Sequence, residues 1–205
     1  MKLNFIFIIF LFISIFKVSS AEQVDFNVWI EDFKVKAEAS GISKETVNQV
    51  LDKSTVIPRI IELDRNQPEF KLTLTQYLNN VVSKRRITKG VKKIRENWDL
   101  LEELSKKYKV QKRFIVALWG IETDYGRVTG GFSVTDALVT LAYDGRRGAY
   151  FSKELINALK IIDQGHISNE NMVGSWAGAM GQTQFMPSSF LNYAKDYNND
   201  GKKDI

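Results

Sequence analysis

The stretch Ala117-Leu-Trp-Gly-Ile-Glu122-Thr-Asp-Tyr-Gly126 places one carboxylate at the end of an otherwise apolar run. Ile115, Leu118 and Trp119 share a helical face with Glu122, at spacings of three and four residues. We expect them to keep water from at least one side of the carboxyl group, which favours its neutral form. A neutral carboxylic acid can donate a proton to a leaving group. Gly126 is predicted to end the helix as its C-cap. The alternative is a glutamate that only marks where a helix reaches solvent.

The first 21 residues look like a secretory signal peptide. Lys2 supplies the positive charge, Leu3 to Phe16 the apolar core, and Ser19-Ser-Ala21 the small residues of a cleavage site. An apolar core of this length is short for a bilayer-spanning helix of about 20 residues, although an uncleaved anchor is the alternative. We therefore expect an exported protein whose residues 22–205 form one domain.

Composition excludes several kinds of chemistry. The chain has no cysteine, so it has no thiol nucleophile, cysteine metal site or lipidated N-terminal cysteine. Its one histidine, His166, has no partner at a metal-ligand spacing, and we expect it at the surface or at a helix end. The net charge of +5 suits an anionic envelope surface. Basic residues concentrate between Lys84 and Arg113, but in an exported protein this favours a solvated helix face, and no nucleic-acid partner is expected.

Helical periodicity runs through most of the chain, and no convincing alternating strand pattern appears. We predict helices over Asp25–Ala39, from Ser43, over Val110–Tyr125, from a capping box at Ser133-Val-Thr-Asp136, and over Tyr150–Ile162. A long amphipathic helix is predicted after Thr88, with five residues facing inward: Val91, Ile94, Trp98, Leu101 and Leu104. Pro58 and Pro68 bracket a short segment. The economical interpretation is one all-α domain.

A second motif covers residues 174–190, Gly-Ser-Trp-Ala-Gly-Ala-Met-Gly-Gln-Thr-Gln-Phe-Met-Pro-Ser-Ser-Phe. Its glycines and alanines allow close backbone approach. Polar Ser175, Gln182 and Gln184 alternate with aromatic and thioether side chains, a mixture that suits a groove binding sugar faces and hydroxyls. The alternative is a tightly packed turn followed by a helix that starts at Pro187.

Three motifs together resemble a known family. The Glu122 motif extended to Arg127, the stretch Tyr143-Asp-Gly-Arg146-Arg147-Gly-Ala-Tyr-Phe151 and the segment 174–189 look like the B-type lytic murein transglycosylases in order and approximate spacing. The resemblance runs from about Phe26 to the last residue. It implies a lysozyme-like, mainly α-helical catalytic domain with extra N-terminal helices in the periplasm. It also implies cleavage of the β-1,4 bond between N-acetylmuramic acid and N-acetylglucosamine in peptidoglycan glycan strands.

The resemblance further implies roles for individual residues. Glu122 takes the place of the single catalytic acid/base, and Ser175 would orient its carboxyl group. The residues that would contact substrate are Arg146, Arg147, Gln184, Met186 and, on a weaker local motif, Tyr77. No cofactor is implied for catalysis. We expect a monomer that associates with other cell-wall enzymes.

The carboxylates constrain the mechanism. Ordinary glycosidases use two carboxylates that flank the bond, but Asp124 follows Glu122 by two residues and would face another side of a helix. Asp136 and Asp144 remain candidates, although each is equally explained by a cap or a turn. A mechanism with one carboxylate that leaves 1,6-anhydro ends fits these residues. Hydrolysis by water, as in a lysozyme-type muramidase, and an inactive peptidoglycan-binding or scaffold domain are the alternatives.

The segment from Asp196 to Ile205 matches an EF-hand calcium loop at positions 1, 3, 5, 6, 7 and 9. The oxygen donors would be Asp196, Asn198, Asp200, the carbonyl of Lys202 and Asp204, with Gly201 at the sharp turn. An ordinary Asp/Asn/Gly turn is the alternative, and the family resemblance implies a structural Ca²⁺ here. Position 12 of the loop would be residue 207, and the family domain continues further, so we expect the C-terminal part of the domain to be missing from this chain.

Overall fold

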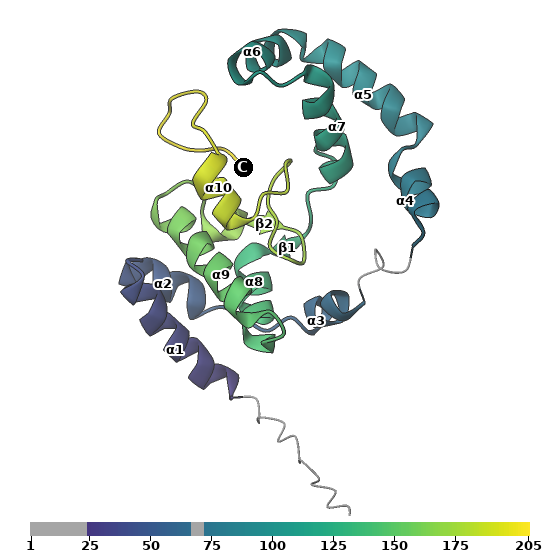
Figure 1. The fold of residues 1–205 in the computed structure, drawn as a ribbon. Coiled ribbons are helices and arrows are strands. Elements are labelled where there is room, and N and C mark those ends of the chain that lie inside the picture. The colour runs from purple at the N-terminus through teal and green to yellow at the C-terminus, as the bar shows by residue number, and fades with distance from the viewer. Residues whose placement is uncertain (1–23, 67–71) are drawn as a thin grey trace, which may run out of the picture.

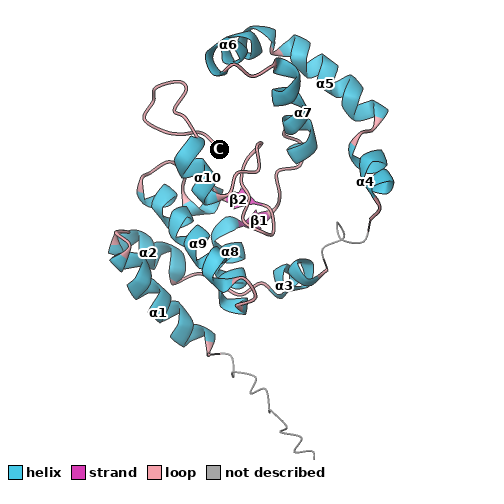
Figure 2. Ribbon diagram, viewed as in Figure 1, coloured by secondary structure: helices cyan, strands magenta, loops and turns pink. Residues whose placement is uncertain are grey.

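The protein was analysed as a computed structural model, which describes residues 24–66 and 72–205. The expected signal peptide, 1–21, and Pro68 lie outside the described residues. Helices dominate the described chain (Figures 1 and 2), which confirms the mainly α-helical prediction. The helices are α1 Phe26–Ala39, α2 Lys44–Leu51, α3 Pro58–Arg65, α4 Leu74–Val81, α5 Lys84–Glu96, α6 Trp98–Tyr108, α7 Lys112–Thr123, α8 Val134–Asp144, α9 Gly148–Asp163 and α10 Pro187–Tyr193. No helix in these described ranges is both long and apolar enough to cross a membrane.

The main core forms around α8. Between Val134 and Ala142 every residue except Asp136 is buried, because this helix is apolar on nearly all sides and packs against α3 and α9. Ser133 caps it by accepting a hydrogen bond from the backbone N–H of Asp136, as the capping motif predicts. Leu138 and Leu141 of this helix are buried.

A smaller core joins α5, α6 and α7, which form the arc at the top of Figure 1. Its buried members are Leu101, Val116 and Tyr125. The single long helix predicted after Thr88 is wrong, because Asn97 ends α5 and its side-chain amide donates to the carbonyl of Lys93 at 2.9 Å. After the break at Asn97, other residues cover only part of the face that was expected to point inward.

Two of the five residues predicted to face inward are exposed. Trp98 and Val91 are half exposed, whereas Leu101 is buried as expected. The predicted stripe assumed one continuous helix, and the break at Asn97 changes the direction of the chain between the two halves.

A short antiparallel pair links the segment after α7 to the glycine-rich segment. Strand β1, Phe132–Ser133, pairs with β2, Val173–Gly174, with Phe132 opposite Gly174. Gly130 lies at φ +107°, and a Cβ there would meet the carbonyl oxygen of Gly174 at 1.9 Å. A Cβ on Gly174 would lie 2.2 Å from the carbonyl oxygen of Ala179. The predicted close backbone approach is therefore confirmed, and glycine is required at both positions.

Candidate active site

The C-terminal end of α7 carries the candidate acid and then turns sharply. Three consecutive residues, Asp124, Tyr125 and Gly126, have positive φ angles of 50°, 63° and 79°. The helix therefore ends at Thr123, with Asp124 as its left-handed C-cap, and the prediction that Gly126 is the cap is wrong. A left-handed non-glycine residue costs about 1–3 kcal/mol and persists only where its surroundings hold it.

Tyr125 supplies one of those restraints. Its ring lies between α5 and α7, and its hydroxyl donates to the carbonyl of Arg86 at 2.8 Å. Gly90 of α5 and Gly120 of α7 leave room for the ring, since a Cβ on either would lie 2.6 Å from the Tyr125 hydroxyl oxygen. Burial raises the pKa of the Tyr125 hydroxyl above its usual value, so the hydrogen bond to Arg86 persists over the physiological range.

Asp124 is the second restraint. Its carboxylate is 4% exposed and accepts a hydrogen bond of 2.5 Å from Nε of Arg127. Arg85 and Lys89 of α5 approach the same oxygen, and Lys89 also donates to the Asp124 carbonyl at 2.8 Å. The hydrogen bond from Arg127 lowers the pKa of Asp124 below its usual value; burial opposes this, and the charges of Lys89 and Arg85 support it. Asp124 is thus engaged with basic groups of α5, which agrees with the prediction that it does not flank a substrate together with Glu122.

Glu122 itself is exposed, and no described residue makes a hydrogen bond or ion pair with its carboxylate. Of the three residues expected to cover it, Leu118 is 60% exposed, whereas Ile115 and Trp119 are partly buried against the smaller core. The expectation that they keep the carboxyl group dry is wrong for this structure, because the Glu122 side chain itself is exposed. The reason is that α7 buries a different stripe, formed by Val116, Gly120 and Thr123, against the rest of the protein.

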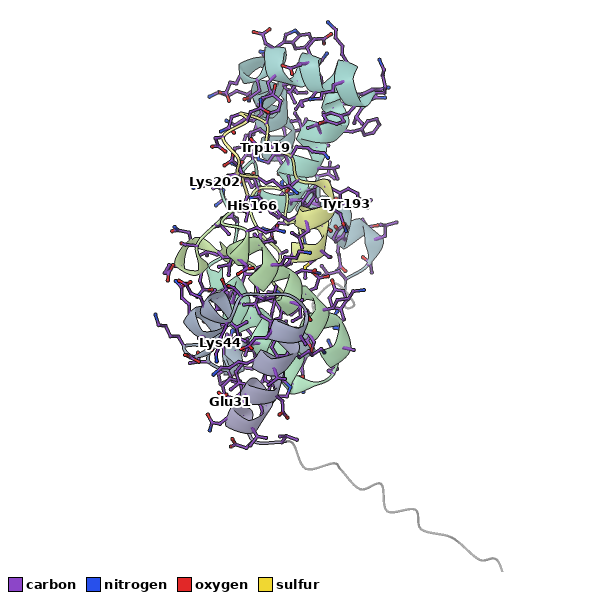
Figure 3. All side chains as sticks on the ribbon, turned by 90° about the vertical axis from the view of Figure 1, so that its left-hand side faces the viewer. Glu31, Lys44, Trp119, His166, Tyr193 and Lys202 are labelled. Atoms are coloured by element: carbon purple, nitrogen blue, oxygen red, sulfur yellow. The ribbon has the colours of Figure 1, made fainter. Side chains whose placement is uncertain are left out.

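The glycine-rich segment packs directly on the end of α7. Nε1 of Trp119 donates to Oε1 of Gln182 at 2.8 Å, and Oγ1 of Thr123 donates to the Gln182 carbonyl at 2.9 Å. Gly126 is close to the same side chain, since a Cβ there would lie 2.4 Å from Oε1 of Gln182. In Figure 3, Trp119 lies where the upper helices meet the lower body. The two sequence motifs are therefore in contact through Thr123 and Gln182. The sequence had suggested Gln182 as a groove residue but not its bonds to α7, and it had not singled out Thr123.

Ser175 belongs to this segment but bonds within it. Its hydroxyl oxygen accepts from the backbone N–H of Ala179 at 3.0 Å, which leaves the hydroxyl proton available to donate. No hydrogen bond joins Ser175 to Glu122. The orienting role inferred for Ser175 therefore stays a proposal.

The other residues inferred to line the groove, Gln184, Met186 and Tyr77, lie in three different structural environments. Gln184 has a left-handed φ of 50°, and its amide donates to the carbonyls of Thr129 and Gly181, both at 3.0 Å. Met186 is the N-cap residue of α10 and packs partly against the main core. Tyr77 lies on α4, half exposed. Figure 1 shows α4 at the far end of α5 from α6, apart from the glycine-rich segment.

Arg146 and Arg147 are held together by a residue that sequence reasoning missed. Asp64, at the end of α3 and 2% exposed, accepts from Nε and Nη2 of Arg146 at 2.6 and 2.7 Å and from Nη2 of Arg147 at 2.6 Å. Burial alone would raise the pKa of Asp64, but the hydrogen bonds from both arginines outweigh it and lower the pKa below its usual value. No periodic signal in the sequence marked Asp64, because its partners lie about eighty residues away.

The remaining acidic candidates have structural partners. Asp136 accepts from the backbone N–H of Thr55 at 3.1 Å, and Asp144 forms a two-pronged ion pair with Arg65 at 2.8 and 3.1 Å. Glu154, which the sequence did not single out, is buried and accepts from the N–H and hydroxyl of Ser188 near the start of α10. Asp136, Asp144 and Glu154 are thus each engaged with partners other than Glu122.

The C-terminal segment forms an ordered turn of oxygen-bearing side chains. The N–H of Gly201 donates to Asp196 at 2.8 Å, and the N–H of Asp200 donates to Asp196 and Asn198 at 3.2 and 3.3 Å. These hard oxygen donors suit Ca²⁺ chemically. Across the described ranges, however, no three histidine or acidic side chains converge to hold a metal ion. Calcium binding by Asp196, Asn198, Asp200, Lys202 and Asp204 therefore stays a proposal.

The protein is thus a mainly helical body in which the exposed Glu122 lies at the end of α7, next to a glycine-rich segment, and comparison with known proteins identifies this fold as that of the lysozyme-like transglycosylases. The model of the Transglycosylase SLT domain family matches residues 25–205, and the chain belongs to that family. Membrane-bound lytic murein transglycosylase B of Escherichia coli (strain K12) is 32% identical over a 171-residue alignment that covers 78% of this chain and 47% of that protein.

Solved structures agree with this assignment. SltB3 of Pseudomonas aeruginosa in complex with NAG-NAM-pentapeptide superposes with a TM-score of 0.85 at 38% identity, over 89% of this chain and 49% of that one. The Escherichia coli lytic transglycosylase Slt35 in complex with calcium superposes with a TM-score of 0.75 at 30% identity, over 86% of this chain and 57% of that one. The relatives place the chain among the B-type lytic transglycosylases, and it spans about half their length.

Proposed function

We propose that this protein is an exported peptidoglycan lytic transglycosylase that uses Glu122 as its only acid/base. The observation that carries the proposal is the family match over 25–205 combined with the position of Glu122, an unpaired carboxylate one residue before the contact between α7 and the glycine-rich segment. The engagement of Asp124, Asp136 and Asp144 elsewhere supports a mechanism with one carboxylate. We propose the periplasm as the location and a monomer as the working form, in association with other cell-wall enzymes.

The reaction proceeds in two proton transfers. Glu122 donates its proton to the glycosidic oxygen, the bond from C1 of N-acetylmuramic acid to that oxygen breaks, and the N-acetylglucosamine side leaves as an alcohol. The substrate's own acetamido group stabilises the positive charge at C1, a recognised departure from the two-carboxylate rule. The C6 hydroxyl then attacks C1 and returns a proton to Glu122, which leaves a 1,6-anhydro end. Because this attack is intramolecular, it benefits from proximity.

Substrate binding would exclude water from Glu122, which is exposed in the free protein. A saccharide packed over Phe114, Leu118 and Ile121 would remove water from around Glu122 and favour its neutral form. Ser175 has a hydroxyl proton available to orient the carboxyl group, while Gln184, Met186 and Tyr77 would contact sugars. Arg146 and Arg147 would face an anionic part of the substrate, and the loop from Asp196 to Asp204 would bind a structural Ca²⁺.

A second candidate is hydrolysis by water, as in a muramidase. The exposure of Glu122 favours it, because water can reach the carboxylate and C1 unless the bound glycan excludes it. The two reactions leave different ends on the product. Anhydro ends identify the transglycosylase, and reducing ends identify the hydrolase.

The test is digestion of purified peptidoglycan followed by mass analysis of the released muropeptides. We expect anhydro products from the wild-type protein and a fall of at least about 100-fold in rate for Glu122→Gln, with an unchanged melting curve. Glu38→Gln, the same substitution at an exposed glutamate near the end of α1, is the matched control and should keep its rate within about twofold. Comparable turnover by Glu122→Gln removes Glu122 from the mechanism. If the wild-type protein releases no muropeptides but still co-sediments with peptidoglycan, it is a binding domain instead of an enzyme.

A further inference from the structure

A tight hairpin in the glycine-rich segment runs from the main core to the end of α7. Met180 and Phe185 form its base, where the N–H of each donates to the carbonyl of the other, at 2.8 and 3.0 Å. Met180 is buried in the main core, and Phe185 packs against that core. The main core therefore holds the base of the hairpin. In Figure 1 the chain between β2 and α10 rises from this base toward α7.

Gln182, at the tip of this hairpin, is hydrogen-bonded to α7 through two of its atoms. Its side-chain Oε1 accepts from Nε1 of Trp119 at 2.8 Å, and its backbone carbonyl accepts from Oγ1 of Thr123 at 2.9 Å. The buried Thr123 hydroxyl also accepts from the N–H of Gly126 at 3.0 Å, so it supports the turn after α7 as well. Glu122 lies between the two α7 residues that Gln182 binds.

Polar contacts are important here because apolar packing does not join the two parts of the molecule. Within the part of the chain that the structure describes, the main core and the smaller core have no residue in common. Close packing fixes side chains inside each core, but it does not fix α7 against the hairpin. The two bonds to Gln182 therefore join the end of α7 to the hairpin, together with one from the Gln184 amide to the carbonyl of Thr129 at 3.0 Å.

We propose that Gln182 is a positioning residue, which sets the place of Glu122 over the glycine-rich segment by binding α7 on both sides of it. This inference rests on the proposed function, in which Glu122 must reach the glycosidic oxygen of a bound glycan. Proton transfer needs a donor and an acceptor about 2.6–3.2 Å apart, and a displacement of about 1 Å can cost about 100-fold in rate. No described residue bonds the Glu122 carboxylate, so the helix that carries it determines its position.

The competing role for Gln182 is direct contact with the glycan, because its side chain is exposed. A double-mutant cycle separates the two roles. Gln182→Leu removes the acceptor, and Trp119→Phe removes the donor but keeps an aromatic ring against Tyr125. Initial rates on soluble, uncross-linked glycan strands give kcat and KM. We expect each single variant to lower kcat about tenfold and to leave KM within about twofold, and the double variant to be no slower than either.

A matched control and a direct measurement of the hydrogen bond complete the experiment. Gln164→Leu is the same substitution at an exposed glutamine that caps the end of α9, and it should keep kcat within about twofold. In NMR spectra, the indole N–H signal of Trp119 is the one that Trp119→Phe lacks. This proton should exchange with solvent faster in Gln182→Leu than in the wild type, and at the wild-type rate in Gln164→Leu.

Each outcome decides the inference. Equal losses of kcat in the two single variants and the double variant support it. Additive losses overturn it, as does a loss in Gln182→Leu that Trp119→Phe does not reproduce, which would assign Gln182 to direct substrate contact. Unchanged indole exchange in Gln182→Leu also overturns it.

The comparison with Glu122→Gln shows whether the inference or the proposed function has failed. Wild-type kcat in Gln182→Leu, beside an inactive Glu122→Gln, overturns the inference alone. Full turnover by Glu122→Gln, or no turnover by the wild-type protein, overturns the proposed function and the inference with it.

Discussion

The packing of Tyr125 between two glycines gives a prediction that can be tested quantitatively. Gly90→Ala would place a Cβ 2.6 Å from the Tyr125 hydroxyl oxygen but 3.5 Å from Cζ, an ordinary contact. Gly120→Ala would place a Cβ 2.6 Å from Cζ and 2.9 Å from Cε1. The first substitution therefore clashes with the hydroxyl alone, whereas the second also clashes with the ring itself.

Tyr125→Phe should consequently rescue one variant and not the other. Loss of the hydrogen bond to Arg86 should lower the free energy of unfolding by about 1 kcal/mol. Gly90→Ala should cost about 2 kcal/mol in overpacking, offset by about 1 kcal/mol of helix propensity. In the double variant Gly90→Ala/Tyr125→Phe the clash disappears, so its free energy of unfolding should be close to that of the wild type. If the two single effects simply added, the double variant would be about 2 kcal/mol less stable than the wild type. Gly120→Ala should stay destabilised in both backgrounds.

Urea unfolding followed by circular dichroism measures all of these variants. Gly131→Ala is the control, because a Cβ there meets nothing within 4 Å and its φ lies outside the left-handed region, so the change should stay within about 0.5 kcal/mol. If Gly90→Ala and Tyr125→Phe are additive, or if Tyr125→Phe rescues Gly120→Ala equally well, the assigned position of the ring is wrong. Because Tyr125 follows Glu122 by three residues, Gly120→Ala should also lower peptidoglycan cleavage.

Two further predictions concern ions and pH. Calcium at about ten times its dissociation constant should stabilise the protein by about 1.4 kcal/mol, which corresponds to about 3–5 °C in melting temperature. Asp200→Asn should abolish this shift, and magnesium should not reproduce it. An identical calcium-induced shift in Asp200→Asn would refute the loop as the binding site. Hydrogen bonds from Ser43 and Thr46 lower the pKa of Asp163, so the stabilisation should be complete above about pH 4 and fade as the pH falls through the lowered pKa. Asp163→Asn should therefore cost about 0.5–1 kcal/mol at pH 7, and the cost should shrink as the pH falls through the lowered pKa of Asp163. A pH-independent cost, measured by urea unfolding, would show that the carboxylate charge is not the cause.

Local signals predicted where several of the helices begin. Asp25, Ser43 and Ser133 each cap the helix that the sequence placed after them, and Pro187 starts α10. A cap is a contact between residues two or three apart, so sequence alone can reveal it. The break at Asn97 was missed because an asparagine in an amphipathic run is a weak signal until its side chain binds the preceding turn.

The candidate site was predicted in part. The contact between Thr123 and Gln182 confirms that the two motifs meet, and the role of Glu122 stays a prediction. The dry environment of Glu122 was wrong because periodicity shows that α7 has apolar stripes but not which stripe other elements cover. Glu154 was missed for the same reason, since an acidic residue on a helix gives no sign of its burial.

The sequence by itself determined where α1, α2 and α8 start, that the segment from Gly174 allows close backbone approach, and which family the chain joins. Those features depend on neighbouring residues or on the residue type itself. Only the tertiary structure decided that Glu122 is open to solvent, that Asp124 turns toward α5 and that Asp64 holds two arginines from another helix junction. Exposure and ion pairing depend on elements that lie far apart in the chain, and folding alone brings those elements together.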